Sequence, residues 1–88
     1  MEIVLLPQAE NDLNYWKEKG DARILKRIRA LLEDILQHPF SGLGKPEALK
    51  GTNGKWSRRI NDEHRMVYFV SSGKVYVYVF SLRYHYSK

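Results

Sequence analysis

The stretch KVYVYVFSL at residues 74–82 decides the fold, because its strict alternation predicts a β-strand. Valines are expected on one face of this strand and aromatic residues on the other. These are Val75, Val77 and Val79 against Tyr76, Tyr78 and Phe80. Both faces are then apolar, which is typical of a central strand covered by helices on at least one side. The stretch therefore predicts the centre of a small sheet.

Two further strands are expected directly upstream. Residues 56–60 and 64–70 repeat with a period of two, and the polar segments 61–63 and 71–73 have the composition of hairpin turns. Before them, residues 39–55 lose this period and contain four glycines and two prolines. We expect a long loop there, with one short turn of helix around residues 47–50, and loops of this length are often functional.

The first half of the chain predicts one strand and two helices. The apolar run at residues 3–6 ends at Pro7 and is typical of a short buried strand. Apolar residues then recur at helical spacing as far as Gly20, and again from the capping residue Asp21 to Pro39. The order β-α-α-β-β-β predicts an α+β fold in which a helical hairpin packs on one face of a mainly antiparallel sheet. The first strand must then enter beside a late strand, in a single domain of residues 1–88.

The chain is small, basic and free of cysteine. Its 88 residues carry 15 Lys and Arg against 10 Asp and Glu, a net charge of +5, and the excess lies in the second half. A polyanion is therefore the first partner to consider. The lack of cysteine excludes disulfides and thiolate chemistry and favours a cytoplasmic protein. The apolar runs are too short for an export signal or a membrane span.

Several polar side chains could together cleave RNA without a metal. That reaction needs a base for the 2'-hydroxyl, a cation for the phosphorane and an acid for the departing 5'-oxygen. Glutamate, arginine and histidine supply these roles, and tyrosine can stack on bases. The candidates are Glu47, Arg58, Arg59, Arg65, Arg83, Tyr84, His85 and Tyr86.

Each candidate taken alone also has an ordinary structural explanation. Glu47 could pair with a neighbouring lysine, and at least one of Arg58 and Arg59 should be a solvated cation, because adjacent strand residues face opposite sides. Residues near a chain end often fray, which weakens the case for His85. No two histidines have the spacing of metal ligands, so we expect no metal and no cofactor.

Four segments carry a family resemblance. They are FSGLGKPEALK at residues 40–50, WSRRI at 56–60, EHRMVY at 63–68 and RYHY at 83–86. In this order and spacing they resemble the YoeB (Txe) branch of the RelE-like bacterial toxins, and the N-terminal strand and first helix also look similar. Residues 51–55 and the final Ser87-Lys88 depart from the family pattern.

The resemblance implies a toxin of a type II toxin–antitoxin system that cuts mRNA in the ribosomal decoding site and leaves a 2',3'-cyclic phosphate and a 5'-hydroxyl. By position, Glu47 corresponds to the general base, Arg65 to the phosphate-stabilising arginine and His85 to the general acid. Tyr86 corresponds to the tyrosine that places the phosphate. The basic residues near RNA correspond to Lys50 and Arg59. We expect Arg58, Arg83 and Tyr84 to bind RNA or the ribosome as well.

The implied partners are mRNA, the ribosome, a YefM/Axe-like antitoxin and a second copy of the chain, with no membrane. Two other functions remain open at this point. One is a ribosome-independent ribonuclease of the same fold, which would cut naked RNA. The other is a non-catalytic module that binds RNA or the ribosome, for which the basic second half and its aromatic strands would suffice.

Overall fold

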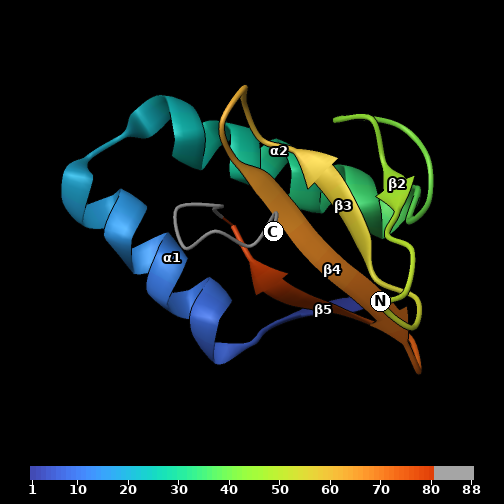
Figure 1. Cartoon of the computed structure of the whole chain (residues 1–88). Helices are drawn as coiled ribbons and strands as arrows, with labels where there is room; N and C mark the ends of the chain where they lie inside the picture. The colour runs from blue at the N-terminus through green and yellow to red at the C-terminus, as the bar shows by residue number, and fades with distance from the viewer. Residues whose placement is uncertain (81–88) are drawn as a thin grey trace.

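A five-stranded sheet with both helices on one of its faces forms the protein in the computed structural model, which describes residues 1–80 (Figure 1). The elements in chain order are β1 (Glu2–Leu5), α1 (Pro7–Lys19), α2 (Ala22–Gln37), β2 (Glu47–Ala48), β3 (Trp56–Arg59), β4 (Arg65–Ser71) and β5 (Lys74–Val79). The strand order is β1-β5-β4-β3-β2. Only the β1–β5 pair is parallel among these described strands. The predicted α+β fold, with its first strand beside a late one, is confirmed.

The helices begin and end where the sequence predicts. Pro7 starts α1, and Gly20 ends it in the left-handed conformation at φ 68°. Asp21 caps α2, because its Oδ1 accepts a hydrogen bond from the backbone N–H of Ile24 at 3.1 Å. Within residues 1–80, neither helix is long and apolar enough to cross a membrane.

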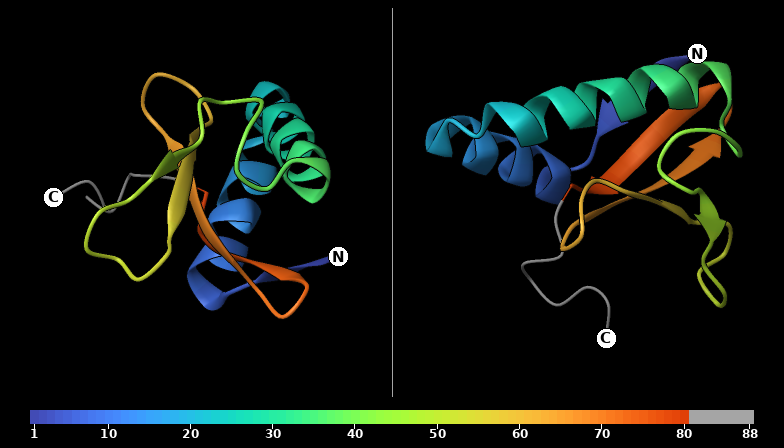
Figure 2. Two further views of the ribbon diagram at one scale, coloured as in Figure 1. Left: turned by 90° about the vertical axis from the view of Figure 1, so that its right-hand side faces the viewer. Right: turned by 90° about the horizontal axis from the view of Figure 1, so that it is seen from above.

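The core lies between the helices and one face of the sheet (Figure 2). From α2 the buried residues are Ile24, Ile28, Leu31 and Ile35, at the helical spacing read from the sequence. From the sheet they are Met66, Tyr68, Val75 and Val77. These alternate along β4 and β5, so the residues between them point to the opposite face. We call that opposite side the helix-free face.

The expected helical turn at residues 47–50 is wrong. Glu47 and Ala48 form the two-residue strand β2, which pairs antiparallel with β3. Glu47 lies opposite Ser57 in this pair. The pairing puts the loop glutamate on the sheet, where its side chain shares a face with that of Ser57.

The expected alternation through residue 80 is also wrong. β5 contains an irregularity at Tyr78, because Val77 pairs with Tyr68 of β4 while Val79 pairs with Val67. The extra residue is a β-bulge, which shifts the alternation by one position. Phe80 therefore joins the core with the first two valines of the strand, whereas Val79 lies outside that core cluster.

Candidate functional site

The helix-free face carries the site residues that come from the strands. Residues opposite one another in a sheet point to the same side. Glu47 lies opposite Ser57, and Arg59 lies opposite Arg65. Arg65 precedes the core residue Met66 and so faces away from the core. Three neighbouring strands thus bring a carboxylate, a hydroxyl and two guanidinium groups to one side of the sheet.

Arg65 and Glu47 form a direct ion pair within this group. The Nη2 of Arg65 donates to Oε1 of Glu47 at 3.1 Å, and its Nε donates to Oγ of Ser57 at 2.7 Å. Ser57 is buried, so its hydroxyl holds the guanidinium at a fixed place on the sheet. The Glu47 side chain is 65% exposed and is held by the arginine at its tip. Arg65 is therefore positioned by the buried Ser57, whereas the exposed Glu47 carboxylate is positioned by its ion pair with Arg65.

Ser57 was missed by the sequence reasoning. A signal for it exists, because Ser57 and Arg59 alternate with the core-facing Trp56 and Arg58 along β3. A small polar residue on the same face as a candidate arginine can orient that arginine. Because β3 pairs with β4, Ser57 and Arg65 lie within hydrogen-bonding reach of each other.

The structure does not place Arg58 with these residues, and its expected role in RNA binding is corrected. Arg58 lies opposite Met66, faces the core and is 0% exposed. Its guanidinium is occupied by hydrogen bonds from three nitrogens. The acceptors are Oδ2 of Asp34 (2.6 Å), the carbonyls of Leu43 (3.0 Å), Ser41 (2.8 Å) and His38, and the Tyr68 hydroxyl (3.1 Å). Arg58 therefore fastens α2 and the loop after it to the sheet.

Two hydrogen-bond partners of Arg58 have shifted pKa values. The hydrogen bond from Arg58, and then one from the backbone N–H of Leu43, hold the pKa of Asp34 below its ordinary value of 3.8. Burial raises the pKa of Tyr68, whose hydroxyl donates to the Pro39 carbonyl at 2.6 Å. The cluster thus contains an ionised carboxylate, an ionised guanidinium and a neutral phenol at neutral pH.

The chain matches the YoeB-like toxins of bacterial type II toxin–antitoxin systems over residues 6–86. It belongs to this family. The chain is 42% identical over 87 residues to the toxin YoeB of Escherichia coli strain K12, an alignment that covers 98% of this chain and 100% of that protein.

Solved structures of YoeB proteins share the fold of this YoeB-like toxin. The YoeB dimer from Staphylococcus aureus superposes with a TM-score of 0.84 at 37% identity, covering 92% of this chain and 94% of that one. The heterotetrameric YoeB–YefM toxin–antitoxin complex from the same organism gives 0.81 at 38% identity, covering 90% and 92%. The family resemblance read from the four sequence segments is confirmed.

The remaining candidates divide into exposed cations and residues of the C-terminal segment. Lys50 and Arg59 of this YoeB-like toxin are exposed. Arg83, Tyr84, His85 and Tyr86 lie outside the described residues. The chain leading to them is fixed at Phe80, whose N–H donates to Oδ2 of the buried Asp12 at 3.1 Å. A carboxylate of α1 thus sets the point at which the chain continues beyond β5.

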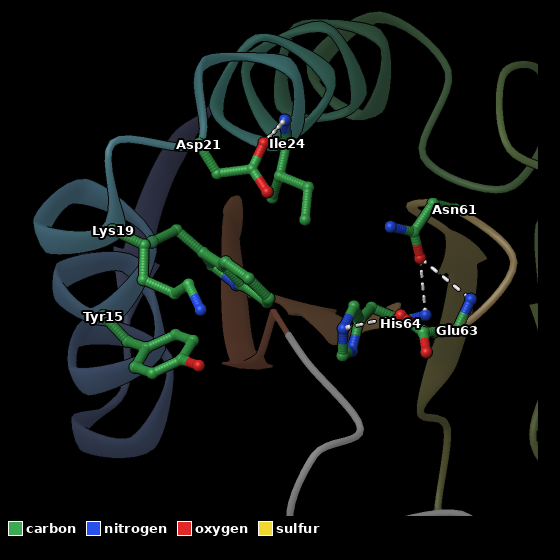
Figure 3. Close-up of a pocket in the computed structure, with 8 residues that line it drawn as sticks. Tyr15, Lys19, Asp21, Ile24, Asn61, Glu63 and His64 are labelled. Atoms are coloured by element: carbon green, nitrogen blue, oxygen red, sulfur yellow. Dashed lines mark hydrogen bonds and ion pairs between the residues drawn. The ribbon is translucent and has the colours of Figure 1, made fainter.

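A pocket of about 610 Å³ lies between the end of α1, the start of α2 and the turn from β3 to β4 (Figure 3). Its lining consists of Tyr15, Trp16, Lys19, Asp21, Ile24, Asn61, Glu63 and His64. The His64 ring packs edge-on against the core residue Trp16 at 5.0 Å, and Asn61 Oδ1 accepts the backbone N–H groups of Glu63 and His64. Charges of both signs line it, so the pocket has no preference for phosphate. Within residues 1–80, no group of three or more ligand side chains is arranged to hold a metal ion.

Proposed function

We propose that this toxin cleaves mRNA on the ribosome by attack of a 2'-hydroxyl, leaving a 2',3'-cyclic phosphate and a 5'-hydroxyl. RelE-like toxins are ribosome-dependent endonucleases. The observation that carries the chemistry is the Glu47–Arg65 pair on the helix-free face, with Arg65 held by a buried serine. A base beside a phosphate-binding cation is what 2'-hydroxyl attack requires.

The ion pair suggests how substrate starts the reaction. An exposed pair such as Glu47–Arg65 is worth only about 0.2–1 kcal/mol, so an incoming phosphate can displace the carboxylate from the guanidinium. Arg65 keeps its hydrogen bond to Ser57 and receives the phosphate by its outer nitrogens. The freed Glu47 carboxylate then accepts the 2'-hydroxyl proton.

The other roles follow the family positions. His85 donates a proton to the departing 5'-oxygen, and Tyr86 helps to place the scissile phosphate. The exposed Lys50 and Arg59, together with Arg83 and Tyr84, bind RNA of the message or the ribosome. No metal or cofactor takes part in the proposed step, since the three charged side chains supply base, cation and acid. Because bacterial ribosomes work in the cytoplasm, we infer a cytoplasmic location for this toxin.

The solved relatives support two protein partners. YoeB of Staphylococcus aureus occurs as a dimer and in a complex with YefM. We infer that this toxin likewise forms a homodimer and is neutralised by a YefM-like antitoxin. An acidic antitoxin segment would complement the basic charge of the second half of the chain.

Ribosomes programmed with a defined mRNA test the proposed function. We expect Glu47→Gln and His85→Gln each to lower the single-turnover cleavage rate by about 10²- to 10⁴-fold, because each removes a proton-transfer group. His85→Gln should still bind ribosomes. Glu63→Gln, at an exposed turn, is the matched control and should cleave normally. End-group analysis should find the cyclic phosphate and the 5'-hydroxyl.

Three outcomes would contradict this proposal in different ways. Equal cleavage of naked RNA and of ribosome-bound message would make the toxin a ribosome-independent ribonuclease. Undiminished inhibition of translation by Glu47→Gln would favour a non-catalytic module that binds the ribosome. A rate that falls when a transition-metal chelator is added, with Mg²⁺ kept for the ribosome, would contradict metal independence.

A further inference from the structure

A row of aromatic rings stands on the helix-free face beside the Glu47–Arg65 pair. Phe69 of β4 stacks on Tyr76 of β5 with ring centroids 4.9 Å apart and planes 13° from parallel, and Tyr78 packs on Phe69 at 5.4 Å. All three are partly exposed. Above the Tyr78 ring lies the Lys55 ammonium, with Nζ 4.1 Å from the centroid. The order along the row is therefore Tyr76, Phe69, Tyr78, Lys55.

The bulge brings the Tyr78 end of this row close to the site. Tyr78 is the extra residue between the pairs Val77–Tyr68 and Val79–Val67. Val67 is two residues from Arg65 along β4, which corresponds to about 7 Å. Bulges commonly occur beside active sites, where they redirect a side chain. Here the bulge places an aromatic face within the reach of a nucleotide bound at Arg65.

We propose that Tyr78 is a stacking platform for a nucleobase of the single-stranded RNA bound at the Glu47–Arg65 site, with Lys55 contacting a phosphate of the same strand. The inference rests on the proposed ribonuclease function and adds a subsite to it. Tyr78 is the ring of the row that meets a cation instead of another aromatic ring on one side. That side is the face that a base can take.

Displacement of the Lys55 ammonium from the Tyr78 ring by a nucleobase is energetically favourable on general grounds. Stacking of a base on an aromatic ring is typically stronger than a cation–π contact at a partly exposed site. The displaced ammonium stays on a flexible side chain next to the bound strand, where backbone phosphates attract it. The charge that covers Tyr78 in the free protein thus becomes a phosphate ligand in the complex.

Charge favours RNA over a second copy of this chain on this patch. Lys55, Arg65 and Lys74 carry positive charge around the row, and the acids are Glu47, which is paired to Arg65, and Glu2, which lies opposite Lys74. A second copy of this chain would bring the same positive charge to the same surface. An extended polyanion with exposed bases meets both the cations and the rings.

The test measures binding of a single-stranded 2'-O-methyl RNA octamer, which the proposed reaction cannot cleave because the 2'-hydroxyl is blocked. One base is replaced by 2-aminopurine, whose fluorescence falls when it stacks. We expect quenching on binding to the wild-type protein and about 10-fold weaker binding with little quenching for Tyr78→Leu. Tyr78→Phe keeps the ring and should bind like the wild type. Lys55→Met should weaken binding and reduce its salt dependence while leaving the quenching intact.

Phe40→Leu is the matched control, because Phe40 is an aromatic residue exposed to 52% that packs on the core-facing Trp56. It should change neither affinity nor quenching. Unchanged quenching in Tyr78→Leu overturns the proposal, and so does the absence of quenching in the wild type, whatever the variants do. A Tyr78→Leu protein that loses only its dimer in sedimentation, or only its antitoxin, would show that the row is a protein interface.

Cleavage on programmed ribosomes separates this proposal from the proposed function. If the wild type cleaves and Tyr78→Leu cleaves and binds equally well, only the stacking platform fails. If the wild type does not cleave at all but quenches and binds through Tyr78, the ribonuclease fails and the RNA subsite stands.

Discussion

Arg58 and Arg59 are adjacent in the sequence and face opposite sides of β3. Arg58 points into the core and is completely buried, whereas Arg59 is exposed on the side that carries Glu47 and Arg65. Burial of a guanidinium is tolerated only where its donors are satisfied, and Arg58 satisfies them with a carboxylate and several backbone carbonyls. One arginine therefore maintains the fold, and the other is available to a ligand.

Replacing each arginine by methionine should separate these roles. Arg58→Met leaves Asp34 and several carbonyls without their partner, so we expect a loss of about 3–5 kcal/mol in the free energy of unfolding. Arg59→Met should stay within about 0.5 kcal/mol of the wild type, since its side chain is exposed. Urea unfolding followed by circular dichroism measures both. Equal losses in the two variants would contradict the buried role of Arg58.

The Asp34 carboxylate gives the same cluster a pH dependence. Its pKa in the folded protein is lowered, chiefly by the hydrogen bond from Arg58, so its ionisation stabilises the fold above the ordinary value of 3.8. That stability is lost as the pH falls through the lowered pKa of the folded state. We expect Asp34→Asn to cost about 1–3 kcal/mol at pH 7 and progressively less below about pH 4.

Urea titrations from pH 3 to pH 7 provide the measurement, and Asp62→Asn provides a control at an exposed turn. The control should differ little from the wild type at every pH. A cost of Asp34→Asn that stays constant down to pH 3 would show that its ionisation adds nothing to stability.

At the scale of elements, local patterns predicted the two helices and the strands β1, β3, β4 and β5, whereas strand pairing decided β2 and the bulge. Pro7, Gly20 and Asp21 mark helix ends by chemistry that the neighbouring residues contain. Glu47 and Ala48 form a strand only because β3 lies beside them. The bulge at Tyr78 likewise exists in the pairing with β4, and the regular alternation of β5 gives no sign of it.

The loop between α2 and β2 contains a glycine, Gly44, that packs closely against α2 and β3. Gly44 has φ +82°, and a Cβ there would lie 2.8 Å from Leu31 Cδ2 and 3.1 Å from the Arg59 carbonyl. Its own carbonyl accepts the Arg59 N–H at 2.7 Å. Gly51 has a similar φ of +71° but open space around it. Of these two glycines, Gly44 is the one that combines a left-handed backbone with crowding.

Gly51→Ala should cost about 1–2 kcal/mol for the left-handed backbone alone. Gly44→Ala should cost about 1–3 kcal/mol more, because its neighbours must also move. We also expect Gly44→Ala to slow mRNA cleavage more than Gly51→Ala does. The reason is that the loop anchored by Gly44 leads directly to Glu47, three residues later. Thermal unfolding and single-turnover cleavage measure the two effects. Equal stability of the two variants would contradict the crowding at Gly44.

At the scale of the whole molecule, the sheet separates the hydrophobic core from the proposed site. The helix side holds the core, and the helix-free face holds Glu47, Ser57, Arg59 and Arg65. Sequence reasoning could name most of these residues because the family resemblance marked them. It could not find the support of Arg65 by Ser57, or the burial of Arg58, because both depend on which side of β3 faces the helices.

The same division makes a prediction about charge. If ribosome binding came from the net charge of +5 alone, removal of any exposed cation would weaken it equally. Screening limits the range of an exposed charge to about 8 Å at physiological salt, so contacts on the helix-free face should dominate instead.

We expect Arg59→Met to weaken ribosome binding and to lower the slope of log K against log salt by about 1. Lys26→Met removes the same charge from the exposed side of α2 and should leave the slope unchanged. Sedimentation of the toxin with ribosomes between 50 and 200 mM salt, roughly the range over which phosphate contacts weaken, measures both slopes. Equal slopes for the two variants would mean that the ribosome responds to total charge and that the helix-free face is not where it binds.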